Sequence, residues 1–117
     1  MKRDPLIYIQ DMLESIEYIK EDTQRLSEKE FSQARIVQQA VVRNIEIMGE
    51  AAQQLPKEFK VHYPTIPWRK IAATRNKIIH EYFGLKIDVI WKTIQDDLPE
   101  LKRQLEQILK DYPTEEK

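Results

Sequence analysis

The residues best suited to chemistry lie in one short segment, 75–82, which contains Arg75, Asn76, His80 and Tyr82. A neutral imidazole can accept the proton of an RNA 2′-hydroxyl, and an imidazolium can protonate the leaving oxygen. A guanidinium can stabilise the charge that builds up on the phosphorane. Because RNA supplies its own nucleophile, this chemistry needs no metal ion. The set therefore suits phosphodiester cleavage in RNA.

The spacing of these residues sets a geometric condition on that chemistry. Asn76 and His80 are four residues apart and share one helical face, whereas Arg75 and Tyr82 are seven apart and share another. On an ideal helix the directions of Arg75 and His80 differ by roughly 140°. The two side chains converge only if the helix ends near His80 or if a partner chain supplies one of them. From spacing alone, the commoner interpretation is a surface Arg and His near a helix end.

Composition removes several other classes of function. The chain has 117 residues and no cysteine, which excludes disulfides, thiolate nucleophiles and cysteine-ligated zinc. Of its two histidines, His62 lies in a proline-bounded loop far from His80, so we expect neither a metal site nor a cofactor. The chain also lacks a nucleophile elbow, a phosphate-binding glycine loop and a HExxH helix. No apolar run approaches the roughly 20 residues that span a bilayer, so we expect a soluble, cytoplasmic protein without a membrane partner.

Charge is distributed less evenly than its total suggests. The net charge is -1, which argues against a protein that coats nucleic acid. Between Lys57 and Lys77, however, six basic residues face a single acid, Glu58, so this segment carries +5. A local anion site is one interpretation, and a solvated basic face balanced by neighbouring acids is the other.

The elements that position segment 75–82 are predicted to be helices. Asp4-Pro5 caps a first helix that ends within 22–26, and Ser27 and Glu30 form a capping box for a second helix that bends near Phe31. Its apolar stripe runs to Leu55. Gly49 interrupts that stripe at a cost of about 1 kcal/mol relative to alanine, so we expect close packing there.

Prolines 56, 64 and 67 limit segment 57–63 to a short helical turn. A third long helix begins at 67–68 and extends to 82–83, with Gly84 as its stop. A fourth begins near Asp88 and ends at Pro113, and Pro99 should either kink it or restart it. One domain, 1–117, is expected because the apolar content suffices for one core. The predicted fold class is all-α, an up-and-down four-helix bundle with a short extra helix.

The sequence resembles the HepT-like branch of the HEPN superfamily. The signature of that branch is an arginine followed by a polar residue, then a histidine with X-Tyr after it, and segment 75–82 matches it as Arg-Asn-X3-His-X-Tyr. The resemblance extends to segments 47–52, 63–69, 80–84 and 89–91, so it covers most of the chain in order. The pair Ala73-Thr74 departs from the Gly-Met-like pair that is more typical before the arginine.

The resemblance implies a HEPN-like dimer in which the Arg-His motifs of two subunits meet in a cleft, with metal-independent endoribonuclease activity. Arg75 and His80 would be catalytic, Asn76 would orient His80 or the phosphate, and the basic segment would help to receive RNA. The residues of that segment are expected to be Arg69, Lys70 and Lys77.

The resemblance also implies a toxin whose partner is a small antitoxin with a nucleotidyltransferase fold. That partner would neutralise the toxin by attaching AMP to the motif tyrosine, here Tyr82. The alternative is a catalytically inactive helical binding subunit of a nucleotidyltransferase complex.

Overall fold

Every regular element in the described part of the chain is helical, as the sequence predicts. The structure is a computed structural model that describes residues 4–80 and 87–111. Its elements are α1 (Pro5–Thr23), α2 (Glu28–Gln33), α3 (Arg35–Gln54), α4 (Lys57–Val61), α5 (Trp68–His80), α6 (Ile87–Lys92), the π-helical segment η2 (Thr93–Asp97) and α7 (Leu98–Asp111). The predicted short extra helix is α4.

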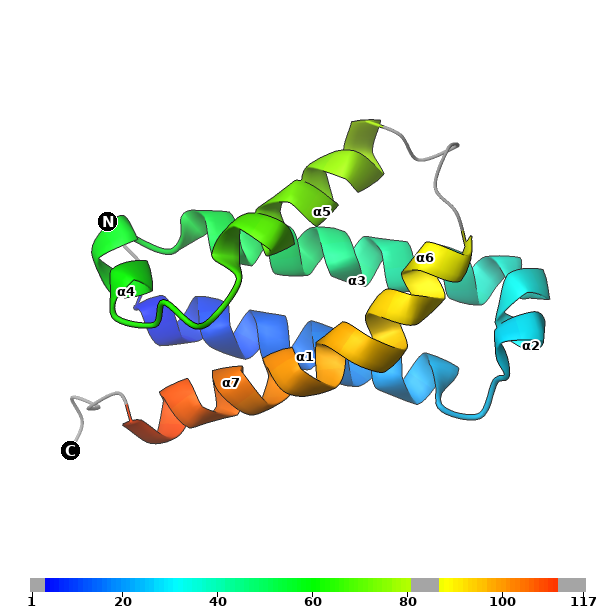
Figure 1. Cartoon of the computed structure of the whole chain (residues 1–117), viewed down its shortest axis with the longest axis horizontal. Coiled ribbons are helices and arrows are strands. Elements are labelled where there is room, and N and C mark those ends of the chain that lie inside the picture. The colour runs from blue at the N-terminus through cyan, green and yellow to red at the C-terminus, as the bar shows by residue number, and fades with distance from the viewer. Residues whose placement is uncertain (1–3, 81–86, 112–117) are drawn as a thin grey trace.

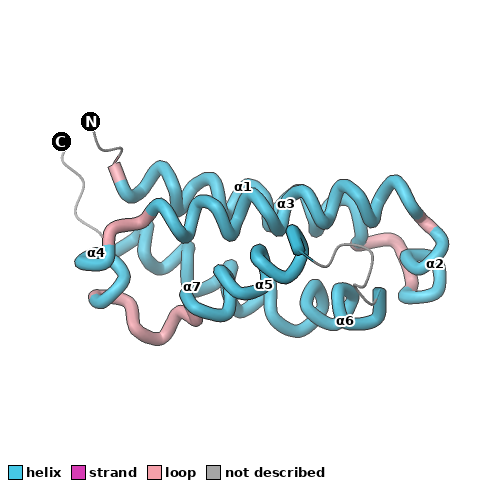
Figure 2. The backbone as a smooth tube through the Cα atoms, turned by 90° about the horizontal axis from the view of Figure 1, so that it is seen from above, coloured by secondary structure: helices cyan, strands magenta, loops and turns pink. Residues whose placement is uncertain are grey.

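The long elements alternate in direction along the bundle. α1 and α3 lie side by side over most of their length, and α5 packs across α3 (Figure 2). The C-terminal end of α5 projects away from the bundle, while α7 returns alongside α1 (Figure 1). The molecule is elongated, with extents of 47 × 29 × 25 Å. Residues 75–80 therefore lie on α5, in the part of the helix that projects from the bundle (Figure 1).

The predicted helix starts are confirmed at the N-terminal half of the chain. The Asp4 carboxylate accepts a hydrogen bond from the Leu6 amide at 2.9 Å, and Pro5 occupies the first helical position. At α2, Ser27 and Glu30 exchange the two hydrogen bonds of a capping box, at 3.1 and 2.9 Å. The expected bend near Phe31 is a full break, because Ala34 leaves the helical region with φ -101° and ψ 79°.

The predicted kink at Pro99 takes the form of the π-helical segment η2, just before it. Proline has no amide hydrogen and its ring clashes with the carbonyl four residues earlier. The wider turn avoids that clash, and the Leu98 amide bonds to the carbonyl of Thr93, five residues back. α6, η2 and α7 therefore form one continuous but locally widened rod.

The apolar stripes meet in a single cluster that includes residues from α1, α2, α3, α4, α6, η2 and α7. Its most buried side chains are those of Ile9, Met12, Ile19, Phe31, Val41, Leu105 and Ile108. Trp68 and Trp91 are half-buried at the edge of the cluster, and Trp91 packs on Phe31 with ring centroids 5.3 Å apart. The predicted stripe that runs to Leu55 therefore lies in the core, where Val41, Ile45, Met48, Ala52 and Leu55 are buried.

Two expected helix ends, at Gly84 and at Pro113, lie outside the described residues. Among the helices in the described part, none is both long and apolar enough to cross a membrane.

Candidate active site

α5 carries the motif residues, and its N-terminal end is held firmly. The Trp68 indole nitrogen donates a hydrogen bond to the Tyr63 carbonyl at 3.1 Å, which ties the first turn of α5 to the preceding loop. Ile71, one turn later, packs against the core cluster. The helix is thus anchored before it reaches Arg75.

α3 and α5 approach each other closely at Gly49. A Cβ atom built at Gly49 would lie 2.2 Å from the Cβ of Arg75 and 2.6 Å from its Cγ. These atoms sit next to the α5 backbone, so they cannot move aside without moving the helix. The close packing expected at Gly49 is confirmed, and its partner is the stem of the motif arginine.

The guanidinium of Arg75 is held from two sides. Its Nη2 atom lies 3.5 Å from a carboxylate oxygen of Glu50, and its Nη1 atom donates a hydrogen bond to the side-chain oxygen of Asn76 at 3.1 Å. The Arg75 side chain is 24% exposed, against 46% for Glu50. Glu50 on α3 is therefore the carboxylate partner of Arg75.

One donor of Arg75 is left unused. Its Nε atom is buried and has no hydrogen-bond partner among the described residues. A buried donor without a partner costs about 1–3 kcal/mol, and such exceptions often occur at functional positions. The hydrogen-bonding capacity of this guanidinium is therefore not exhausted by the fold.

The remaining motif residues are only partly covered by the structure. The backbone of α5 is helical through His80, and the His80 side chain lies outside the described part. Tyr82 lies outside the described residues altogether. The roughly 140° divergence that an ideal helix imposes on positions 75 and 80 applies here, because both belong to one helix.

The three basic residues expected to receive RNA have different surroundings. Arg69 and Lys77 are exposed on α5. Lys70 forms an ion pair with Asp97 of η2, at 3.2 Å. Lys70 is thus partly neutralised, whereas no ion pair is found for Arg69 or Lys77 with any described residue.

A cavity of about 390 Å³ adjoins Arg75. α1 contributes Tyr8 and Asp11 to its wall, and α3 contributes a longer set of residues: Ile47, Glu50, Ala51, Gln53 and Gln54. This cavity was not predictable from the sequence, because α1 and the end of α3 are far apart along the chain. Gly49 indicated close packing nearby but not the cavity itself.

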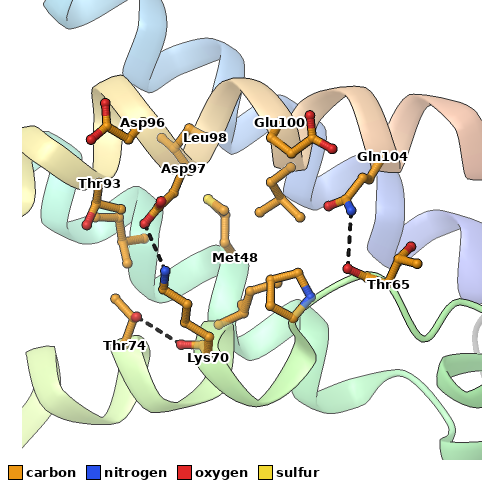
Figure 3. A pocket seen from close by; sticks show the side chains of 14 residues that line it. Met48, Thr65, Lys70, Thr74, Thr93, Asp96, Asp97, Leu98, Glu100 and Gln104 are labelled. Carbon is orange, nitrogen blue, oxygen red and sulfur yellow. Dashed lines mark hydrogen bonds and ion pairs between the residues drawn. The ribbon is translucent and has the colours of Figure 1, made fainter.

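A second cavity, of about 340 Å³, lies between α5 and the η2–α7 segment and does not include Arg75 (Figure 3). Met48, Ile71 and Leu101 are among its apolar lining residues, and Asp97 reaches across to Lys70. Glu100 also lines it. Hydrogen bonds from the Arg103 guanidinium lower the pKa of the Glu100 carboxyl. This acidic cavity is a poor place for a phosphate.

The fold and the site together define a class of protein, the all-helical bundles that carry an Arg-X4-His motif on a helix packed against the core. The family described as "Ribonuclease HepT-like" matches residues 12–108. "Probable ribonuclease HepT" of Thermococcus cleftensis is 43% identical over 110 residues, covering 94% of this chain and 100% of that protein. A protein of Caldanaerobacter subterraneus named as a "Putative RNase" is 39% identical over 107 residues, covering 92% and 96%. No solved structure matches this chain.

The chain belongs to the HepT-like ribonuclease family of the HEPN superfamily. A related sequence also forms part of a larger protein. A Methanocaldococcus jannaschii protein named "Gamma-glutamylcyclotransferase and putative RNase" is 40% identical over 111 residues, which are 95% of this chain but 50% of that protein.

Proposed function

We propose that this protein is a metal-independent endoribonuclease in which Arg75 and His80 carry out the cleavage. The observation that carries the proposal is Arg75 itself, whose stem packs on Gly49 and whose guanidinium is fixed by Glu50 and Asn76. A surface arginine has no need of such support. Family membership and the names of the relatives point to the same activity.

His80 and Arg75 divide the chemistry between them. The imidazole of His80 takes the proton of the 2′-hydroxyl, so that this oxygen attacks the adjacent phosphorus. The bond from phosphorus to the 5′-oxygen then breaks, and that oxygen receives a proton, which leaves a 2′,3′-cyclic phosphate. Arg75 stabilises the charged phosphorane throughout. The nucleophile comes from the substrate, and therefore the reaction proceeds without a metal ion.

Two copies of the chain complete the site in this proposal. Positions 75 and 80 diverge on one helix, so a dimer in which two motifs meet in a cleft can bring Arg75 of one chain and His80 of the other to the same phosphate. Exposed Arg69 and Lys77 then contact the RNA backbone at the edges of the cleft. Lys70 contributes less, because Asp97 partly neutralises it.

In the cell the protein acts as the toxin of a toxin-antitoxin pair. Its partner is a small antitoxin with a nucleotidyltransferase fold, which attaches AMP to Tyr82 and so blocks the RNA cleft. An adenylyl group two residues from His80 adds negative charge where the RNA phosphate must bind, which explains how the modification would inhibit cleavage.

Growth after induced expression tests this proposal. Wild type should arrest growth, and His80→Ala, produced at the same level, should not. Co-expression of the partner should restore growth and raise the intact mass of the wild type by one adenylyl group, an increase that Tyr82→Phe abolishes. Toxicity that survives His80→Ala would contradict the assignment.

The second candidate is a catalytically inactive binding subunit of a nucleotidyltransferase complex. The ion pair between Arg75 and Glu50 is the observation that favours it, because a paired guanidinium is partly neutralised. Tight binding of the partner together with no cleavage of any RNA at high protein concentration would support this alternative.

A further inference from the structure

We propose that a groove between the C-terminal part of α1 and the rod formed by α6, η2 and α7 binds a medium-chain carboxylate, an alkyl chain with one negative head group. The groove has a volume of about 440 Å³, and no described residue of α5 lines it. It is therefore separate from the candidate active site. The inference goes beyond the proposed RNA cleavage and does not depend on it.

The irregular helix at η2 explains why the groove exists. α7 packs along α1, whereas α6 rises away from α1 and contacts α2 (Figure 1). The π-helical turn and Pro99 lie where these two directions separate, and both features bend helices. The rod thus leaves the surface of α1, and a gap opens between two apolar helix faces.

The floor of the groove is apolar. α1 contributes Ile16 and Ile19 to it, and the rod contributes Ile94 and Leu98, all of which are buried. Cavities with such a lining bind apolar molecules, because each methylene group placed there is removed from water. The body of the ligand is therefore a hydrocarbon.

The length of the groove favours a chain over a compact ring. Trp91 and Lys102 are the first and last residues of the rod in the wall. At the helical rise they lie roughly 16 Å apart along the rod, a length that an alkyl chain of about ten carbons can follow.

The charges in the wall select an anion. Two lysines, Lys20 and Lys102, line the groove, and no carboxylate of the described residues does. Lys102 Nζ lies 3.4 Å from a carboxylate oxygen of Glu17, which stands outside the wall, one turn before Lys20 on α1. Both lysines are therefore at the same end of the groove.

These lysines still have donors to offer. An ammonium group has three N–H donors, so Lys102 can bond to Glu17 and to a ligand together. Lys20 forms no ion pair with any described residue. One carboxylate head group between the two lysines would therefore be stabilised, whereas a cationic head group would be repelled.

Trp91 marks the opposite end of the groove and supplies a signal for binding. Its ring packs on Phe31 with centroids 5.3 Å apart, and it also lines the groove. The chain has two tryptophans, and Trp68 does not line the groove. In Trp68→Phe the indole fluorescence therefore reports on the groove alone.

Titration of full-length Trp68→Phe with decanoate, below its micelle concentration, tests the proposal. The Trp91 emission should move to shorter wavelength and saturate. Decylammonium, which has the same chain and the opposite charge, should bind roughly tenfold more weakly. From hexanoate to decanoate the affinity should rise by about fourfold for each methylene group. Calorimetry on the wild type should give the same affinity for decanoate.

Variants of the wall separate the contributions of charge and space. Lys20→Gln and Lys102→Gln should each weaken decanoate binding by about two- to fivefold, without weakening decylammonium. Gln95→Phe, at an exposed position of the wall, should fill the groove and abolish binding of both. Lys110→Gln is the matched control, because it removes an exposed lysine of α7 that does not line the groove.

Three results would overturn the proposal while leaving the ribonuclease assignment untouched. They are the absence of saturable decanoate binding, equal affinities for decanoate and decylammonium, and binding that Gln95→Phe retains. If decanoate does not bind and Gln95→Phe instead changes the size of the protein in light scattering, the groove is a contact between copies of the chain, and the carboxylate site is wrong.

Discussion

Arg75 depends on a neighbour that has no side chain. α5 can approach α3 only because position 49 is glycine, and that approach places the guanidinium of Arg75 against Glu50. The stem of Arg75 is fixed by packing and its head by polar contacts. An arginine on a free helical surface would sample many rotamers, and it would lose that conformational entropy when a phosphate binds.

Gly49→Ala tests whether the close approach of α3 and α5 is what holds Arg75 in place. The added methyl group improves helix propensity by about 1 kcal/mol, but it must overlap the Arg75 stem at 2.2 Å, an overpacking that costs about 1–3 kcal/mol. We expect a net loss in the free energy of unfolding, measured by urea denaturation, together with a larger loss of RNA cleavage. Ala52→Gly, one turn later in α3, is the control for backbone flexibility. A variant that gains stability and keeps full cleavage would refute the packing argument.

For the individual residues of the candidate site, the sequence indicated which residues matter but not which residues they contact. Arg75 and His80 stood out because their chemistry fits RNA cleavage, and Gly49 because it is costly in a helix. The Arg75–Glu50 ion pair was not predictable, since it joins residues 25 positions apart through a helix crossing that only the fold defines.

Among the elements, α2 is a short helix whose start is specified by local sequence, through its capping box. Six residues form too short a helix to be stable alone, so the reciprocal bonds of Ser27 and Glu30 fix where it begins. Phe31 then enters the core and holds the helix against Trp91.

Ser27→Ala tests this account of α2. We expect the free energy of unfolding to fall by about 1 kcal/mol, because an orphan amide at the helix start loses its acceptor. Ser32→Ala, in the same helix, removes a hydroxyl that bonds to the Lys29 carbonyl and should have a smaller effect. If thermal denaturation shows the same loss of stability in the two variants, the capping box is not the cause of the loss in Ser27→Ala.

Helix ends proved more predictable than helix irregularities. The caps at Asp4 and Ser27 are local, so a few residues suffice to recognise them. The break at Ala34 has no proline or glycine to announce it, and Pro99 announces a disturbance but not whether it becomes a kink or a π-helical turn. In both cases packing against other helices decides the outcome.

For the molecule as a whole, the central question is how the two proposed catalytic residues can act on one phosphate when helical spacing sets them roughly 140° apart on one helix. A dimer answers it if Arg75 of one chain and His80 of the other act on the same phosphate. The all-helical bundle was predictable because four amphipathic stripes must bury each other. The way in which two bundles associate was not predictable, because the residues of a surface that pairs with a second copy do not recur at a regular spacing in the sequence.

Mixing two inactive chains tests whether the site is shared. Arg75→Ala and His80→Ala chains, unfolded and refolded together, should recover about one quarter of wild-type cleavage, since half of the dimers are mixed and each has one intact site of two. The separate chains should stay inactive, and the sizes of all samples are compared by light scattering. No recovery in mixed dimers of normal size would place both groups in one chain.

The most direct test of the whole account is the cleavage of a purified tRNA pool in EDTA by unmodified wild type and by His80→Ala, with the fragment ends analysed. We predict that the wild type produces fragments ending in 2′,3′-cyclic phosphate and that His80→Ala, equally folded, produces none. Cleavage that EDTA abolishes, or that His80→Ala retains, would contradict a metal-independent ribonuclease built on Arg75 and His80.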